Sequence, residues 1–253
     1  MLTIIAAILF AGYFWCPWVI SAFLSFVGVL VVYELIHNAA KVDNVVIVVG
    51  ACLYSAVTIL SSQYRFEFLF VPSVLYNIIS VAFIIFFHKQ LNIEKIAFIY
   101  GTPTLFTVSL CMLNALINHT NGFYYLVLLF CFSSVCDIGA YFTGVTIGKH
   151  KLCPEISPKK TIEGAIGGIL LSAIFVVVTM HLFGNINIYL LLLTIPLCIL
   201  GIMGDLFASV IKRSAGIKDF GNLIPGHGGV LDRVDSIIMI VPAMFLLFVF
   251  NII

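Results

Sequence analysis

The sequence predicts an all-α membrane protein that crosses the bilayer about eight or nine times. Of its 253 residues, 62% are hydrophobic and only 9% are charged, and the mean hydropathy is +1.21. A soluble domain carries about a quarter charged residues, so this chain has too little charge to cover a surface in water. Its apolar runs are continuous rather than alternating, which disfavours a membrane β-barrel.

Nine apolar segments, separated by short polar or Gly/Pro breaks, are the expected membrane helices, since a full crossing takes about 20 apolar residues. They are residues 2–14, 17–36, 45–62, 70–87, 95–117, 123–147, 162–183, 187–206 and 236–253. The first segment is short. We expect it either as a half-helix or as one arm of a tight hairpin around Pro17, so the predicted count stays at eight or nine.

Basic residues gather on one side of these expected helices. If the segments alternate in direction, eleven of the twelve Lys and Arg residues lie on the same side, and only Arg65 lies on the other. Cytoplasmic loops of membrane proteins carry such an excess of basic residues. We therefore expect a protein of a bacterial-type inner (plasma) membrane, with its basic side in the cytoplasm.

Acidic residues concentrate in the second half, with seven of the eleven between 137 and 235. We expect a single domain with a hydrophobic scaffold at residues 1–122 and a catalytic transmembrane region at 123–253. The net charge of +1 gives no reason to expect a nucleic-acid partner. The seven cysteines show no CxxC pair and no zinc spacing, which favours reduced structural thiols.

Asp137 lies inside the sixth apolar segment. A carboxylate there is costly and usually faces a cavity or a partner. Gly139, Ala140 and Gly144 follow at spacings that allow close helix approach. We expect Asp137 to belong to a functional site; the alternative is a packing helix whose aspartate pairs with a nearby lysine.

A second polar stretch, residues 157–164, precedes the seventh segment. We expect Ser157 to cap the following helix and Pro158 to enter its first turn. Lys159 and Lys160, beside the hydroxyls of Ser157 and Thr161, would form an anion-binding site at that helix N-terminus. Ordinary cytoplasmic flanking charge explains the two lysines about equally well.

Two further constellations lie on either side of residue 214. If the eighth helix continues, Asp205, Ser209 and Lys212 share one face, because they are spaced i, i+4 and i+7. A glycine-rich stretch, residues 225–229, follows, and its bare backbone amides can approach an anion closely. The acidic and basic side chains around it suit phosphoryl chemistry with Mg²⁺.

These segments together resemble the signature of the phosphatidate cytidylyltransferases, or CDP-diacylglycerol synthases. The resemblance runs through Ser209-Val-Ile-Lys-Arg213, Lys218-Asp219 and Pro225-Gly-His-Gly-Gly-Val-Leu-Asp-Arg-Val-Asp235, and the segments at Asp137 and Ser157–Gly164 are similar too. It covers residues 130–240 in motif detail. One departure is Ala208, where many relatives carry Glu.

The resemblance implies transfer of CMP from CTP to phosphatidate, giving CDP-diacylglycerol and pyrophosphate in phospholipid biosynthesis, with Mg²⁺ and often K⁺. It implies Asp205 and Asp232 as metal ligands. The implied catalytic residues are Lys212, Arg213, Lys218, Asp219, His227, Arg233 and Asp235. The implied nucleotide- and phosphate-binding residues are Asp137, Ser157, Lys159, Lys160, Thr161, Ser209, Gly228 and Gly229.

The expected partners are CTP, phosphatidate and the lipid bilayer, and a homodimer is compatible with the sequence. Two alternatives from other classes stay open. A CTP-dependent polyprenol or phytol kinase would transfer the γ-phosphate of CTP instead of CMP. A transporter would use Asp137 and Asp205 as an ion path, although it predicts broken helices in both halves of the chain.

Overall fold

A computed structural model describes residues 17–64, 70–87, 91–221 and 228–253. The expected first segment, 2–14, lies outside these residues. The chain divides into two compact units. The N-terminal unit contains Thr3–Asn118 and Ser214–Arg233, and the C-terminal unit contains His119–Arg213 and Val234–Ile253. The connection between the last two helices therefore belongs to the N-terminal unit, although it comes late in the sequence.

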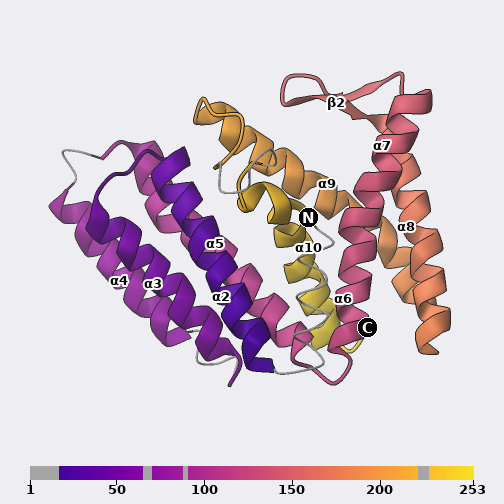
Figure 1. Cartoon of the computed structure of the whole chain (residues 1–253), viewed down its shortest axis with the longest axis horizontal. Helices are drawn as coiled ribbons and strands as arrows, with labels where there is room; N and C mark the ends of the chain where they lie inside the picture. The colour runs from indigo at the N-terminus through magenta and orange to yellow at the C-terminus, as the bar shows by residue number, and fades with distance from the viewer. Residues whose placement is uncertain (1–16, 65–69, 88–90, 222–227) are drawn as a thin grey trace. The chain divides into compact units, whose positions relative to one another are not determined.

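The N-terminal unit is a bundle of apolar helices, drawn in indigo to magenta in Figure 1. Helix α2 contacts α3 and α5, and α4 packs on α3 and α5. A π-helical turn, η1, extends α2. The bounds are α2 Pro17–Tyr33, η1 Glu34–Ala39, α3 Val45–Ser62, α4 Phe70–Phe86 and α5 Ile93–Ile117.

A buried polar cluster ties three of these helices together. Asn114 of α5 is fully buried. Its Oδ1 accepts a hydrogen bond from Ser21 Oγ of α2 at 2.9 Å, and its Nδ2 donates to Ser62 Oγ of α3 at 3.0 Å. Helices in lipid gain no hydrophobic free energy when they associate, so side-chain hydrogen bonds between them contribute to their association. The cluster therefore helps to fix the packing of α2, α3 and α5.

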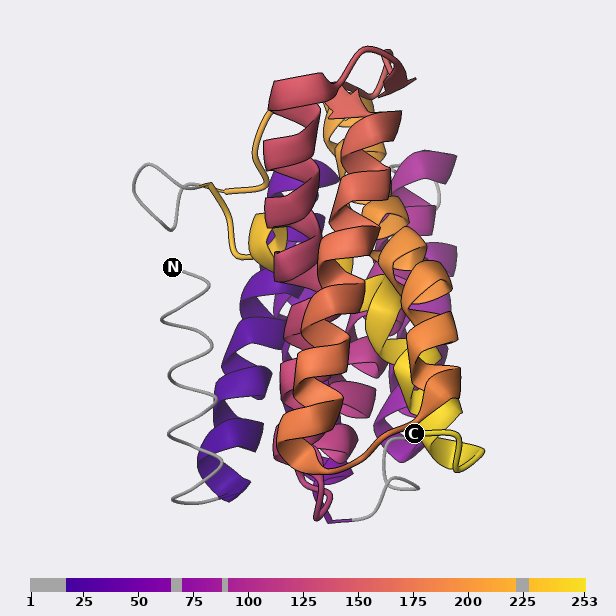
Figure 2. The same cartoon turned by 90° about the vertical axis from the view of Figure 1, so that its right-hand side faces the viewer.

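The C-terminal unit combines helices with a short β-hairpin. Figure 2 shows α7 and α8 side by side along their lengths, with the hairpin β1–β2 beyond their ends. A π-helical turn, η4, joins α6 to α7. The bounds are α6 Gly122–Phe130, η4 Cys131–Val135, α7 Cys136–Ile147, β1 Lys151–Cys153, β2 Ser157–Thr161, α8 Ile162–Phe183, α9 Ile188–Ser214 and α10 Leu231–Val249.

Small residues bring α7 and α8 close together. A Cβ on Gly139 of α7 would lie 3.0 Å from the Cα of Gly168 on α8, and a Cβ on Gly164 would lie 2.7 Å from the carbonyl oxygen of Ala140. Larger side chains at these positions would separate the two helices. The prediction that the small residues of these segments permit close helix approach is therefore confirmed.

Six helical stretches in the described part are long and apolar enough to cross a membrane. Two other expected segments do not meet these criteria. Helix α4 has only 17 residues, and α10 carries three charged residues in its first five positions. An all-α polytopic membrane protein is thus confirmed, while the count of eight or nine stays a prediction. The six stretches are Trp18–Ala39, Val45–Ser62, Lys95–Ile117, Gly122–Ile147, Ile162–Phe183 and Ile188–Ser214.

The hairpin corrects one local prediction. Ser157 does not cap a helix and Pro158 does not enter one, because both lie in strand β2, where Cys153 pairs with Ser157 and Lys151 with Thr161. Thr161 is the true cap of α8, and its Oγ1 accepts the backbone N–H of Gly164 at 3.1 Å. Pairing with β1, which a local motif does not reveal, delays the start of the helix by several residues.

Candidate active site

The C-terminal unit contains a polar cavity of about 500 Å³. Residues of α7, the β-hairpin, α8 and α9 line it, so four elements that are separate in the sequence supply its walls. Charged side chains are prominent in this lining in a chain that has few of them. They are Asp137, Lys151, Lys159, Lys160 and Asp205.

An ion pair crosses the cavity between β2 and α9. Lys160 Nζ contacts Asp205 Oδ2, and the two side chains are 24% and 31% exposed. A lysine ammonium has three donors, and Asp205 is the one carboxylate within ion-pair distance of Lys160 among the described residues. Lys160 therefore retains donors that a phosphate oxygen in the cavity could accept.

Asp137 of α7 completes this charged group. Its side chain is exposed to the cavity, and the charges of Lys160 and Asp205 both act on it. The lysines of this cavity can bind a polyanion, and its two carboxylates can bind a cation. The structure thus brings together Asp137, Lys159, Lys160 and Asp205, which the sequence places in three separate segments.

Glu163 holds the hairpin against the end of α7. Its carboxylate accepts the backbone N–H groups of Lys149 and His150 at 3.1 Å and contacts His150 Nδ1 at 2.6 Å. Thr161, at the end of the hairpin, is buried between Gly144, Gly148 and Gly164. Its hydroxyl accepts the backbone N–H of Gly164 and so caps α8. These contacts position Lys159 and Lys160 over the cavity.

Helix α9 continues to Ser214, as the spacing of Asp205, Ser209 and Lys212 requires for one shared face. Asp235 of α10 belongs to the same unit, and the charges of Asp205, Lys212 and Asp137 act on it. Arg213 follows with an exposed side chain. Ser209 is half-buried and, like Ser157, does not line the polar cavity.

The predicted metal ligands belong to different units, Asp205 to the C-terminal and Asp232 to the N-terminal one. Within the described ranges, no group of three or more His, Cys, Asp or Glu side chains forms a candidate metal site. Mg²⁺ usually needs only one or two carboxylates, with substrate phosphates and water completing its shell. Asp205 and Asp137 fit that requirement, since both face one cavity.

Asp232 organises the connection between α9 and α10, residues 215–230, of which 222–227 lie outside the description. Its Oδ2 accepts the backbone N–H groups of Phe220 and Gly229, both at 3.0 Å. Gly228 has φ +82°, and a Cβ there would lie 3.0 Å from Asp232 Oδ2, so both conformation and space favour glycine.

The other predicted residues in and next to this connection differ in exposure, and one of them lies outside the described residues. Lys218 and Asp219 are exposed, and Arg233 is half-buried in the first turn of α10. His227 lies outside the described residues, so its implied catalytic role stays a prediction. Gly229 is buried in contact with a residue that sequence reasoning missed, Glu34.

Glu34 lies at the end of the first described membrane helix, in a region predicted to be hydrophobic scaffold. It is fully buried and accepts hydrogen bonds from the backbone of Val230 and Leu231. A signal for it existed in the sequence, because a carboxylate within an apolar segment is costly and needs a partner. Its partners are nearly 200 residues away, which no local pattern reveals.

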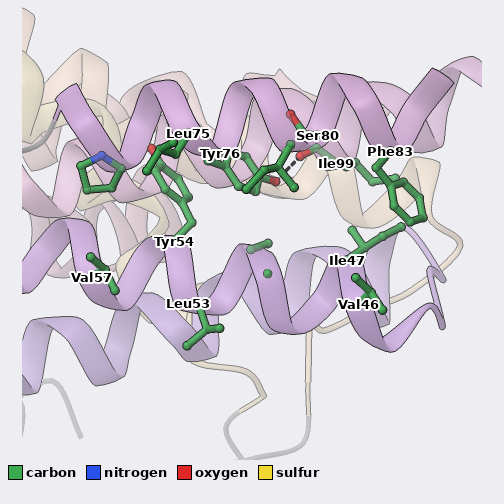
Figure 3. Close-up of a pocket in the computed structure, with 14 residues that line it drawn as sticks. Val46, Ile47, Leu53, Tyr54, Val57, Leu75, Tyr76, Ser80, Phe83 and Ile99 are labelled. Carbon is green, nitrogen blue, oxygen red and sulfur yellow. Dashed lines mark hydrogen bonds between the residues drawn. The ribbon is translucent and has the colours of Figure 1, made fainter. Parts of the chain in front are cut away.

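A second cavity, of about 290 Å³, lies in the N-terminal unit between α3, α4 and α5. Figure 3 shows its mainly apolar walls, with Leu53 and Val57 from α3 and Leu75 and Phe83 from α4. The rings of Tyr54 and Tyr76 stack at 4.3 Å between their centroids. None of the described residues that line this cavity is charged, so they do not supply the groups that a phosphate-transfer site needs.

Comparisons with known proteins agree with this chemistry. The model of the Cytidylyltransferase family matches residues 1–251. A phosphatidate cytidylyltransferase of Staphylococcus haemolyticus is 39% identical over 178 residues, which is 68% of each chain. Proteins of the same name from Staphylococcus epidermidis and Staphylococcus aureus are 39% and 35% identical, again over 68% of each chain.

Proposed function

The chain belongs to the cytidylyltransferase family, and we propose that it transfers CMP from CTP to phosphatidate, giving CDP-diacylglycerol and pyrophosphate. The observation that carries this proposal is the polar cavity of the C-terminal unit. Lys159, Lys160, Asp137 and Asp205 face one space of about 500 Å³, within a protein of which only 9% of the residues are charged. Such a mixture of cations and carboxylates suits a nucleoside triphosphate and its counterion.

The reaction joins two anionic groups. A phosphate oxygen of phosphatidate attacks the α-phosphorus of CTP, the bond to the bridging oxygen of the β-phosphate breaks, and pyrophosphate leaves. That oxygen is already anionic at neutral pH, so no strong general base is needed. The barrier is repulsion between the polyanions and charge on the leaving group, which positioned cations lower. Lys159 and Lys160 are the cavity's candidates for that role.

Mg²⁺ would neutralise phosphate charge and orient the leaving group when bound. We propose Asp205 as one of its ligands, since its carboxylate lines the cavity. The resemblance adds Asp232 as a second ligand, and Asp137 is the carboxylate that shares the cavity with Asp205. A requirement for K⁺ is proposed on the resemblance alone. Metal titration of the wild-type enzyme and of Asp137→Asn and Asp232→Asn would separate these ligands.

The membrane setting fits a lipid substrate. Helix α8 exposes a stripe of apolar side chains, Ile166, Leu170 and Ile174, as expected for a face in contact with lipid. Phosphatidate can keep its acyl chains in the bilayer while its phosphate reaches the polar cavity. We further propose eight or nine crossings of a bacterial-type inner membrane, with this cavity open to the cytoplasm, as the distribution of Lys and Arg favours.

Labelled CTP provides the test of the reaction. The purified protein in detergent micelles is incubated with phosphatidate and with CTP labelled at either the α- or the γ-phosphate. The proposal expects α-label in the chloroform phase and γ-label in pyrophosphate. Transfer of γ-label to lipid would instead identify a lipid kinase. Asp205→Asn, prepared in the same way, is the control for contaminating activity.

The orientation is tested by labelling from each side of the membrane. A single cysteine in place of Lys151, in a cysteine-free background, should react with an impermeant maleimide in inside-out vesicles. It should stay unlabelled in right-side-out vesicles until the membrane is permeabilised. The opposite pattern would place the polar cavity on the outer side, and the proposed access of cytoplasmic CTP would be wrong.

A further inference from the structure

Glu34 is a buried carboxylate that the proposed chemistry does not use. It lies in η1, where α2 ends, and its side chain has no exposure to solvent. Oε1 accepts the backbone N–H of Val230 and Oε2 that of Leu231, each at 2.9 Å. Both carboxylate oxygens are therefore engaged by the backbone at the start of α10. A negative charge at a helix N-terminus is also stabilised by the helix dipole.

Two glycines of the α9–α10 connection are fitted to this carboxylate. A Cβ on Gly221 would lie 2.7 Å from Glu34 Oε1, and a Cβ on Gly229 would lie 2.6 Å from Oε2. Ordinary Cβ contacts are longer than 3.0 Å, so a larger residue would require either the connection or the Glu34 carboxylate to shift and would disturb their hydrogen bonds. The two sides of the connection, before and after its undescribed part, thus meet the same side chain.

A second side chain of η1 holds the same segment. Asn38 Nδ2 donates a hydrogen bond to the carbonyl oxygen of Phe220 at 2.6 Å. The backbone N–H of Phe220 in turn donates to Asp232. One short π-helical turn therefore fixes the backbone on both sides of the glycine-rich stretch. Such turns recur at functional sites, because the widened turn redirects side chains.

We propose that Glu34 is a positioning residue that holds the α9–α10 connection in its active conformation. This inference rests on the proposed function, since the connection carries Lys218 and Asp219 of the family signature, and the first turn of α10 carries Asp232 and Arg233. Glu34 acts through the backbone and touches neither nucleotide nor lipid. Its carboxylate holds the start of α10, from which the Asp232 side chain reaches back to Phe220 and Gly229.

The decisive variant is Glu34→Gln, which keeps the shape of the side chain. The amide can accept one backbone N–H through its oxygen, but its NH₂ group opposes the other N–H donor. We expect kcat to fall about tenfold or more, since loss of a charged, buried bond changes the barrier by that order. We expect the KM for CTP to change less than kcat. Glu34→Asp, which keeps the charge on a shorter side chain, should recover part of the loss.

Hydrogen exchange gives a second readout that does not depend on activity. The amides of Val230 and Leu231 donate to Glu34 in the wild-type protein. Exchange in a peptide covering residues 228–236 should therefore accelerate about tenfold in Glu34→Gln. If wild-type protein forms no CDP-diacylglycerol, the proposed function fails, while this exchange measurement still tests the contact.

Asn114→Ala is the matched structural control. Asn114 is as buried as Glu34 and belongs to the same unit, but it bonds Ser21, thirteen residues before Glu34 along α2 and η1. That separation is about 20 Å along a helix. We expect this variant to unfold more easily yet to keep kcat within about twofold, with normal exchange at 228–236. General destabilisation would lower both variants alike.

Two results would overturn the inference. The first is a wild-type kcat in Glu34→Gln, even if exchange at 228–236 accelerates, since anchoring would then not serve the reaction. The second is exchange at 228–236 that stays as slow as in the wild-type protein. If Glu34 variants do not fold, Asn38→Ala removes only the bond to Phe220 and should lower kcat about threefold to tenfold. Unchanged kcat there would equally contradict a positioning role for η1.

Discussion

Two buried or half-buried carboxylate regions of the molecule differ in what they contact. In the N-terminal unit, the hydrogen bonds of Glu34 within the described part of the chain all come from backbone N–H groups, and its side chain has no exposure to solvent. In the C-terminal unit, Asp137 and Asp205 face a cavity, and Asp205 pairs with the side chain of Lys160. Both kinds of carboxylate are costly in an apolar helix, so each must serve a purpose.

The difference teaches how to separate positioning from binding in a membrane enzyme. A carboxylate whose oxygens are both engaged by the backbone holds a segment in place and has little left for a ligand. A carboxylate that shares a cavity with a lysine can exchange that partner for a metal ion or a phosphate-bound cation. Substitutions in the two regions should therefore differ in the size of their effect and in the property that they change, activity or stability.

The largest effect is expected from Asp205→Asn. Loss of this charge leaves Lys160 without its partner and removes a proposed metal ligand from the cavity. We expect kcat to fall about a thousandfold, which is the upper range for a single electrostatic group in an active site. Cytidylyl transfer in detergent measures it. Hydrogen exchange of residues 228–236 should stay at the wild-type rate. Activity above a tenth of wild type would contradict a direct role of Asp205 in binding or catalysis.

Glu34→Ala should have the largest effect on stability. The substitution leaves two buried backbone N–H groups without an acceptor, at about 1–3 kcal/mol each. We expect the free energy of unfolding to fall by roughly 2–4 kcal/mol, allowing for partial relaxation around the smaller side chain. Denaturation of the detergent-solubilised protein by SDS measures it. Asp205→Asn should change stability far less, because the Asp205 side chain is 31% exposed whereas Glu34 is fully buried.

The two cavity lysines should differ by about a factor of ten. Lys160 is half-buried and paired with Asp205, whereas Lys159 is exposed. We expect Lys160→Ala to lower kcat/KM for CTP about thirtyfold and Lys159→Ala only about threefold, since exposed charges are screened by water and salt. Steady-state kinetics at two ionic strengths would check this. Equal losses would mean that burial does not distinguish the two side chains.

The smallest effect is expected from Glu163→Gln. The carboxylate holds the hairpin through the backbone of Lys149 and His150, but it is 23% exposed and its partner His150 is 76% exposed, so water weakens these contacts. We expect the KM for CTP to rise about threefold with kcat nearly unchanged, because the hairpin carries the lysines without taking part in the reaction. A loss in kcat larger than that of Lys160→Ala would instead indicate a direct role.

Helix positions could be predicted from the sequence where apolar runs have clear ends. The bounds 45–62 and 162–183 agree with α3 and α8. The face shared by Asp205, Ser209 and Lys212 follows from helical periodicity once α9 continues. These are local properties of the chain, so a local pattern is enough to predict them.

The features that were missed depend on contacts between distant segments. The hairpin needs β1 to pair with β2, and the Ser-Pro pair before Lys159 is as typical of a helix start as of a strand edge. Glu34 needs Val230 and Leu231, which follow it by nearly 200 residues. The gathering of Asp137, Lys160 and Asp205 into one cavity was expected from their charge, but its walls depend on the packing of α7, α8 and α9.

The two π-helical turns set the rotational phase of the helices that carry these carboxylates. Glu34 is the first residue of η1, and η4 ends two residues before Asp137. Deleting one residue from an α-helix rotates everything beyond it by about 100°. A π-helical turn holds about one residue more than an α-helical turn, so a one-residue deletion in η4 would restore regular helix and keep Asp137 facing the cavity. The same deletion in α6 would turn Asp137 away. Natural single-residue length variation within these helices should therefore occur at the two π-helical turns.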